Sequence, residues 1–308
     1  MKFLKTNFGI KKGETVLIVT DDNKIGIAKG IERAARRLSD EVLLMKMRPG
    51  SRHAEEPPQA VSEAMKSADV VIIPTTMSLT HTDARKAACT AGARVASMPG
   101  ITEQMFKRGG LTADYGQVKR ISERVAKMLT KAREIRIRTR LGCDFTASLL
   151  GRKGVADTGI LTKKGAFGNL PAGEGYIAPV EGNSQGVLVF DGSFAGIGVL
   201  KRPLKITVNG GKAVKIEGDR GKLKKMLSLD GDNIAEVGIG TNPKAKLIGN
   251  VLEDEKVMGT VHVALGDNHN FGGKIRADIH LDGIIKRPDI WLDDTKIMEN
   301  GRFVSRVA

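Results

Sequence analysis

Short apolar stretches alternate with amphipathic stretches along the first half of the chain. The apolar stretches are rich in β-branched residues and have strand length: 15–20 (TVLIVT), 41–47 (EVLLMKM), 69–74 (DVVIIP) and 93–98 (ARVASM). Apolar residues recur at helical spacing between them, in 25–38, 58–67 and 81–91. Strands that alternate with helices build a parallel sheet covered on both faces. We therefore predict a Rossmann-like, parallel layered α/β domain over residues 1–138.

The turn after the first predicted strand, TDDNKIG, has neither glycine pattern that holds nucleotide phosphates. Those patterns, GxGxxG and GxxxxGK followed by Ser or Thr, need glycines so that the backbone can approach the phosphate. We therefore expect the N-terminal domain to act as a scaffold.

The pattern changes near residue 139, where short β-type runs are separated by glycine turns. VNGGKA, for example, predicts two strands joined by a tight turn. One helical stretch is expected near 220–229. The fold class predicted for the whole chain is therefore α/β, with a C-terminal β-rich α+β domain over residues 139–308. Its turns are suited to display reactive side chains.

Composition and the chain start favour a cytoplasmic protein. Hydrophobic residues make up 41% and charged residues 28% of the 308 residues, as in globular proteins. Two cysteines, Cys89 and Cys143, form no CxxC pair, which suits a reducing compartment. The N-terminus shows no signal-peptide pattern, and no apolar stretch approaches the roughly 20 residues that span a bilayer. We expect no membrane partner.

The net charge of +15 raises the question of nucleic acid, because clustered Lys and Arg bind phosphates. The basic excess lies mainly in the N-terminal half and is densest in 118–140. No RNP motif, zinc finger or helix-turn-helix accompanies it, and aromatic residues make up only 4%. We interpret the excess as a solvated basic face and do not expect a nucleic-acid partner.

Three of the five histidines lie in the stretch HVALGDNHNFGGKIRADIHLD, residues 262–282. His280 and Asp282 are two residues apart, so on a strand their side chains point to the same face. His262 lies upstream across a glycine-rich connection, which a bent hairpin can reverse. The three side chains can therefore share a divalent metal ion.

Two further carboxylates lie in positions that favour metal binding. Glu174 follows a Pro-containing turn in GNLPAGEGYIAP, and Glu236 lies inside the apolar run DNIAEVGIG. A carboxylate among apolar residues needs a partner, and a divalent cation is a suitable one. Two Glu, two His and one Asp suit Zn, Co or Mn, and they are more ligands than one catalytic ion usually takes. We therefore expect two ions per chain.

The motifs NLPAGE, AEVGIG, HVALG and HLD occur in this order in the C-terminal half. Their succession resembles the aminopeptidase T family of thermophilic metallopeptidases, and ARVASMPGIT in the N-terminal half is similar as well. The resemblance implies a dinuclear metalloaminopeptidase that removes N-terminal residues from peptide substrates. It implies the ligands Glu174, Glu236, His262, His280 and Asp282, with Glu236 as the bridge. It also implies a homodimer.

Under this hypothesis two ions activate a bridging water and polarise the scissile carbonyl. Glu255 is the candidate general base or sixth ligand, since the family has a further acid shortly before the first His. His269 is the candidate to stabilise the oxyanion or to position the substrate. The predicted enzyme class is hydrolase.

The chain also resembles the 2,5-dihydroxypyridine dioxygenases of the same superfamily, which are ring-opening enzymes with non-haem iron. His262, His280 and Asp282 alone form a 2-His-1-carboxylate set, as in Fe(II) oxygenases. A non-catalytic relative is a third alternative. We favour the hydrolase, because Glu174 and Glu236 occupy the matching positions and a mononuclear iron site does not need them.

Overall fold

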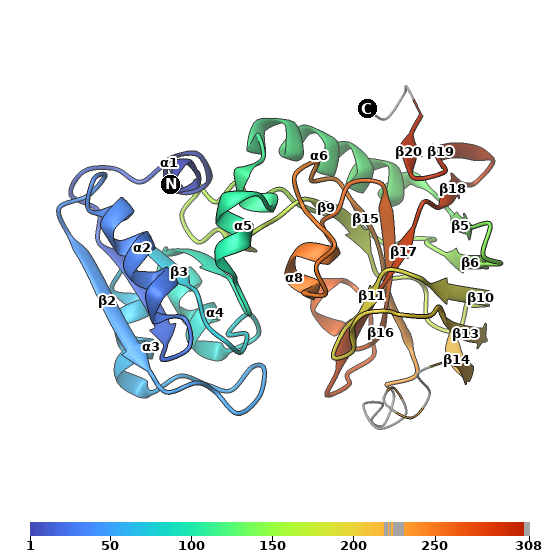
Figure 1. The fold of residues 1–308 in the computed structure, drawn as a ribbon, viewed down its shortest axis with the longest axis horizontal. Helices are drawn as coiled ribbons and strands as arrows, with labels where there is room; N and C mark the ends of the chain where they lie inside the picture. The colour runs from blue at the N-terminus through green and yellow to red at the C-terminus, as the bar shows by residue number, and fades with distance from the viewer. Residues whose placement is uncertain (219–220, 222, 224–230, 305–308) are drawn as a thin grey trace. The chain divides into compact units, whose positions relative to one another are not determined.

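The computed structural model describes residues 1–218, 221, 223 and 231–304 (Figure 1). Close contacts divide the chain into two units. The first unit contains Met1–Tyr115 and Gly159–Ala172, and the second contains Gly116–Thr158 and Gly173–Ala308. The helix expected near 220–229 lies outside the described residues, apart from 221 and 223.

The first unit is built on a parallel sheet with the strand order β2-β1-β3-β4-β8. Its strands are β1 (Val16–Asp21), β2 (Val42–Met47), β3 (Val70–Ile73), β4 (Arg94–Ser97) and β8 (Phe167–Asn169). Its helices are α1 (Lys2–Phe8), α2 (Ile25–Ala35), α3 (Gln59–Lys66), α4 (Asp83–Thr90), α5 (Glu103–Lys107) and the 3₁₀ turn η1 (Gly110–Thr112). The predicted α/β fold class is confirmed.

Both faces of this sheet are buried, as its continuous apolar strands predict. Leu17 and Val19 of β1 pack with residues of α3 and α4. Their neighbours Val16 and Ile18 point to the opposite face, are equally buried, and lie on the strand that α2 contacts. Helices therefore cover the sheet on two sides.

The contacts divide the chain at different places from the expected boundary at residue 138. Helix α6 (Tyr115–Lys131) lies almost wholly in the second unit. The segment 159–172 returns to the first unit, where β8 extends the parallel sheet beside β4. Asn7 fixes this segment by donating its side-chain N–H to the carbonyl of Gly159 at 2.8 Å. A non-local strand pairing of this kind leaves no periodic signal in the sequence.

The second unit contains two antiparallel sheets, with the strand orders β14-β13-β10-β6-β5-β18-β19-β20 and β12-β11-β17-β16-β15-β9-β7. The strands of the eight-stranded sheet are β5 (Glu134–Arg138), β6 (Asp144–Ser148), β10 (Ser184–Phe190), β13 (Leu204–Asn209), β14 (Lys212–Glu217), β18 (Asp289–Leu292), β19 (Thr295–Glu299) and β20 (Arg302–Phe303). Those of the seven-stranded sheet are β7 (Val155–Asp157), β9 (Glu174–Ile177), β11 (Ser193–Phe194), β12 (Gly198–Val199), β15 (Ile234–Gly240), β16 (Thr260–Gly266) and β17 (His280–Lys286). The hairpin predicted at VNGGKA is the β13–β14 pair.

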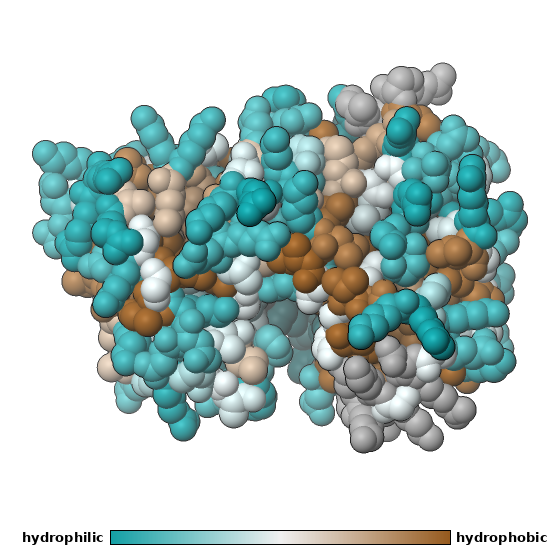
Figure 2. All heavy atoms as spheres, viewed as in Figure 1, coloured by the Kyte–Doolittle hydropathy of each residue, from teal (hydrophilic) through white to brown (hydrophobic). Residues whose placement is uncertain are grey.

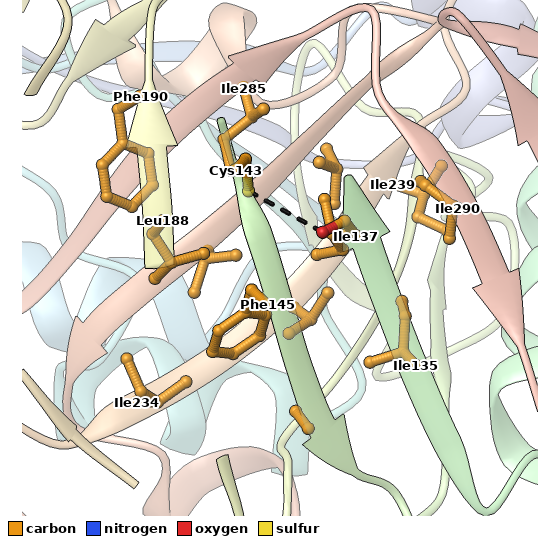
Figure 3. Packing of buried hydrophobic residues seen from close by; sticks show 14 of the residues in the cluster. Ile135, Ile137, Cys143, Phe145, Leu188, Phe190, Ile234, Ile239, Ile285 and Ile290 are labelled. Atoms are coloured by element: carbon orange, nitrogen blue, oxygen red, sulfur yellow. Dashed lines mark hydrogen bonds between the residues drawn. The ribbon is translucent and has the colours of Figure 1, made fainter. Parts of the chain in front are cut away.

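The core of the second unit lies between its two sheets. Figure 3 shows Phe145 and Leu188 of the eight-stranded sheet packed with Ile234, Ile239 and Ile285 of the seven-stranded sheet. Since side chains alternate along a strand, the residues between these core positions point to the other face of the seven-stranded sheet. That face carries the polar residues described below.

Among the described residues of the second unit, the helical elements include α6, the short α8 (Val251–Asp254) and the 3₁₀ turn η2 (His269–Phe271). Hydrophilic residues cover most of the face seen in Figure 2. On α6, Lys119, Arg120 and Lys127 are exposed, while Val125 and Leu129 are buried. None of the helices in the described part of the chain has the length and apolarity needed to span a bilayer.

Candidate metal centre

Five acidic and histidine side chains lie on one face of the seven-stranded sheet. The strand register places Ala264 opposite both Glu236 and Asp282. His262 and His280 are each two residues from a member of that row, so they point the same way. Glu174 pairs with Gly240, which is four residues after Glu236 and therefore also on that face. The structure thus brings together all five metal ligands that the sequence predicts.

The ligand atoms form two groups that share Glu236. The first group contains Glu174, Glu236 and His262: Nε2 of His262 lies 3.1 Å from Oε2 of Glu174 and 3.2 Å from Oε1 of Glu236. The second contains Glu236, His280 and Asp282: Nε2 of His280 lies 3.5 Å from Oε2 of Glu236 and 3.6 Å from Oδ1 of Asp282. Each group has the size of a cation site.

Two buried oxygens in these groups accept no hydrogen bond, and they suit contact with a cation. Oε2 of Glu174 and Oδ1 of Asp282 are both in this condition. Buried carboxylate oxygens are costly unless hydrogen-bonded or bound to a cation. Oxygen and imidazole ligands suit a first-row divalent metal ion. The residues present therefore fit such an ion.

The imidazole of His280 is oriented as metal-binding histidines are. Its Nδ1 lies 2.8 Å from the carbonyl oxygen of Asp267. A carbonyl can only accept, so Nδ1 carries the proton and Nε2 presents its lone pair to Glu236 and Asp282 when the ring is neutral. A metal ligand usually has its other ring nitrogen held in this way.

Gly238 makes room for the imidazole of His262. A Cβ atom at residue 238 would lie 2.1 Å from Nε2 of His262, which is far inside van der Waals contact. Gly238 and His262 are opposite each other in the β15–β16 pair, so any side chain at 238 would point at the ring. The glycine in AEVGIG therefore serves the site.

The electrostatics of the metal-free site show that it favours positive charge. Burial lowers the pKa of His280, but the charge of Asp282 outweighs burial and raises that pKa to about 10. Burial also opposes ionisation of Asp282, yet His280 lowers the pKa of this carboxyl to about 2. Burial raises the pKa of Glu236. Protons on the imidazoles therefore balance the carboxylates until a metal ion replaces them.

Lys256 and Asp157 complete the acidic cluster, and sequence reasoning missed both. Nζ of Lys256 lies 2.5 Å from Oε1 of Glu174, 2.5 Å from Oε1 of Glu255 and 3.4 Å from Oδ2 of Asp157. Asp157 of β7 pairs directly with Glu174 of β9. The run EDEK contained a signal for Lys256, since a lysine beside three acids forms ion pairs easily, but nothing in the run shows that it is buried.

The two predicted catalytic residues occupy different surroundings. Glu255 contacts Lys256, and burial raises the pKa of its carboxyl to about 8. His269 is exposed on η2, where its Nε2 lies 2.8 Å from a guanidinium nitrogen of Arg276. Neither residue belongs to the two ligand groups.

Comparison with known proteins decides the family. The NicX family model, described as 2,5-dihydroxypyridine 5,6-dioxygenase, matches residues 4–305. This chain belongs to the NicX family. The 2,5-dihydroxypyridine 5,6-dioxygenase of Pseudomonas putida is 25% identical over 277 residues, covering 80% of this chain and 74% of the relative.

Two solved structures have a similar fold. The 2,5-dihydroxypyridine dioxygenase of Pseudomonas putida KT2440 has a TM-score of 0.83 at 20% identity, covering 99% of this chain and 95% of that chain. Wild-type AmpT from Thermus thermophilus has a TM-score of 0.69 at 16% identity, with 98% and 97% covered. At these identities the likeness shows the fold alone.

Membership of the NicX family overturns the prediction of an aminopeptidase. The hydrolase, protease and peptidase assignments are wrong, because the family model and the curated relative both carry a dioxygenase description. The wider resemblance to aminopeptidase T is correct at the level of the fold. The prediction relied partly on Glu174, whose Oε1 contacts Lys256, a contact that the sequence pattern does not show.

Proposed function

We propose that this chain is a metal-dependent dioxygenase that opens the ring of a dihydroxylated pyridine, with 2,5-dihydroxypyridine as the first substrate to test. The observation that carries the proposal is the family match over residues 4–305, a range that includes every side chain of the metal centre. In such a reaction one ring C–C bond breaks and each of its two carbons gains one atom of O2. The reaction balances without an external reductant.

One Fe(II) ion is the metal that the donor set and the family favour together. His262, His280 and Asp282 would supply two nitrogens and one carboxylate, the set typical of non-haem Fe(II) oxygenases. Glu236 would add a second carboxylate, because its two oxygens face both Nε2 atoms. When bound, the iron would supply the redox chemistry that lets O2 react with an aromatic ring. The expectation of Zn, Co or Mn followed from taking two Glu, two His and one Asp as ligands.

Two aromatic side chains beside the centre suit an aromatic substrate. The ring of Phe271 lies edge-to-face with Tyr176 at 5.6 Å and with His280 at 5.8 Å between centroids. Aromatic pairs favour such arrangements, and a substrate ring can join them. We assign Tyr176 and Phe271 to contact with the substrate ring.

Tyr176 also offers a hydrogen bond to a substrate oxygen. It shares the sheet face of Glu174, two residues before it on β9. Burial and the nearby charges of Glu236 and Glu174 raise the pKa of its phenol far above the usual value. The hydroxyl group therefore stays protonated and can donate to a substrate hydroxyl or its anion.

The test is anaerobic loading of the full chain with Fe(II), followed by addition of 2,5-dihydroxypyridine and O2. We expect one O2 consumed per substrate, loss of the pyridine absorbance, and both atoms of ¹⁸O2 in the ring-opened product. His280→Ala should abolish turnover. The matched control His269→Ala should keep it, since His269 is exposed and outside the ligand groups. Iron-loaded wild type that takes up no O2 with this or related dihydroxypyridines would reject the proposal.

A further inference from the structure

Lys256 is a buried lysine at the centre of an acidic cluster. Its side chain is 2% exposed, and its ammonium contacts three carboxylates, those of Glu174, Glu255 and Asp157. Lysine is rarely buried to this degree unless its charge is paired. Fixed positive charge therefore occupies one end of the metal centre.

The backbone holds Lys256 in place from both sides. Its N–H donates to the carbonyl of Glu253 at 3.0 Å, and its own carbonyl accepts from the N–H of Asn242 at 2.9 Å. A Cβ at Gly240 would lie 2.0 Å from the carbonyl oxygen of Val257, so only glycine lets this segment lie against β15. The lysine is thus positioned by the fold rather than by a flexible loop.

The ammonium divides the carboxylates of the site into two sets. Glu174, Glu255 and Asp157 contact Lys256, and Glu174 also faces His262 through its other oxygen. Glu236 faces both imidazoles, and Asp282 faces that of His280. Glu236, His280 and Asp282 form one ligand group by themselves, whereas the other group needs Glu174 beside Glu236 and His262. A second ion would need Glu174, whose other oxygen already contacts the ammonium. Like charges at such short range repel strongly in a buried site.

We propose that Lys256 takes the place of a second metal ion and thereby limits the centre to one. The inference rests on the proposed metal centre and adds a residue that determines the number of ions it holds. Lys256 does so by holding Glu174 and Glu255 and by repelling a second dication. It is a positioning residue, because it contacts the carboxyl groups of Glu174, Glu255 and Asp157 rather than substrate.

Metal counting in the full chain tests this directly. Protein freed of metal is titrated anaerobically with Mn(II), and bound ions per chain are counted by elemental analysis after gel filtration. We expect one ion in wild type and in Lys256→Arg, which keeps the charge. Lys256→Ala should bind two ions, since it frees Glu174, Glu255 and Asp157. The control Lys286→Ala removes a half-exposed lysine paired with Asp191 and should leave the count at one.

Electron paramagnetic resonance adds a readout that does not depend on turnover. Wild type should give the signal of an isolated Mn(II) ion. Lys256→Ala should give an exchange-coupled pair, because Glu236 belongs to both ligand groups and can bridge them. Two ions in wild type, or a folded Lys256→Ala that still binds one, would overturn the inference while leaving the dioxygenase proposal intact.

Two conservative variants keep the inference testable if Lys256→Ala does not fold. Glu174→Gln and Glu255→Gln remove partners of the ammonium, and both should still bind one ion. Loss of that ion in either variant would show that Glu174 or Glu255 is a ligand and would contradict the assignment. Wild type that binds no divalent ion would reject both the inference and the proposed metal centre.

Discussion

Buried acids occur in both units of the molecule, and they differ in what surrounds them. In the first unit, Asp21 ends β1 and is fully buried. Its carboxylate accepts from the N–H groups of Asn23 and Lys24 at 3.0 and 3.2 Å, and from the N–H and the hydroxyl of Thr76. In the second unit, one oxygen of Glu174 and one of Asp282 are buried and accept no hydrogen bond.

The comparison distinguishes Asp21, a carboxylate with a structural role, from the carboxylates that are candidate metal ligands. Asp21 borders a cavity of about 180 Å³ at the carboxyl edge of the parallel sheet, a common place for ligands. Its hydrogen bonds nevertheless join the ends of β1 and β3, which explains the buried charge. Glu55 and Glu56, beside the same cavity, are likewise bonded to nearby backbone N–H groups. What distinguishes the acids of the second unit is that they form two groups of ligand atoms together with His262 and His280.

The largest effect should come from Gly238→Ala. The added methyl group would occupy the space of the His262 ring, so the ring must leave the ligand groups. We expect metal binding to fall below detection and turnover to fall by more than about 100-fold, as for loss of a ligand. Metal titration and O2 uptake measure the two effects.

Gly26→Ala is the matched control for that substitution. Gly26 lies in α2 and has no atom within 4 Å of a Cβ placed on it. Alanine is favoured in helices by roughly 1 kcal/mol over glycine, so this variant should keep its metal and lose no stability. If Gly238→Ala binds metal as well as Gly26→Ala does, the assignment of His262 as a ligand is wrong.

The next effect compares the two kinds of carboxylate. Asp282→Asn should weaken metal binding by about 10- to 100-fold and shrink the rise in melting temperature on metal loading. Asp21→Asn should leave metal affinity unchanged. It should lower the free energy of unfolding by about 2 kcal/mol, with or without metal, because an amide cannot accept all the hydrogen bonds that the carboxylate accepts. Thermal unfolding with and without metal distinguishes the two variants. A loss of metal affinity in Asp21→Asn would contradict the structural role assigned to Asp21.

Local patterns predicted much of the fold. The runs expected at 15–20 and 41–47 are β1 (Val16–Asp21) and β2 (Val42–Met47), and the helix expected at 25–38 is α2 (Ile25–Ala35). Period-two alternation also placed His280 and Asp282 on one face. These features depend on neighbours in sequence, so a sequence pattern carries them.

Features that depend on distant contacts were not predictable. β8 joins the sheet of the first unit through a non-local pairing with β4. Lys256 reaches Glu174 across 82 positions of sequence. The aminopeptidase prediction followed from the order of the motifs and from Glu174 and Glu236 in matching positions, and neither shows that one oxygen of Glu174 contacts an ammonium. The homodimer stays a prediction that gel filtration with light scattering can test.

The pH dependence of the metal-free protein should report on the centre. The folded-state pKa of His280 is raised to about 10, above the unfolded value of about 6.5. Its contribution to stability is therefore full below about pH 6.5 and lost as the pH rises toward 10. Metal affinity should increase over the same range, because the proton must leave before the metal binds.

Urea unfolding of metal-free wild type and His280→Gln between pH 6 and pH 10 checks this. The stability of wild type should fall with pH more steeply than that of the variant, and the two curves should converge near pH 10. Parallel curves would show that protonation of His280 is not linked to folding. The negative charge of the neighbouring carboxylates would then be offset by a group other than His280.

The smallest effect should come from removing one of the hydrogen bonds to Asp21, the one from the hydroxyl of Thr76. The hydroxyl of Thr76 donates to Oδ1 of Asp21 at 3.0 Å and is one of several donors to this carboxylate. Thr76→Ala should cost about 1 kcal/mol, the usual net value of one hydrogen bond, since the backbone N–H groups remain. Metal affinity should not change. Urea unfolding measures the loss, and a cost near that of Asp21→Asn would mean that Asp21 is poorly satisfied without Thr76. The contrast between the two units would then be one of degree, because the carboxylate of the first unit would also depend on a single partner.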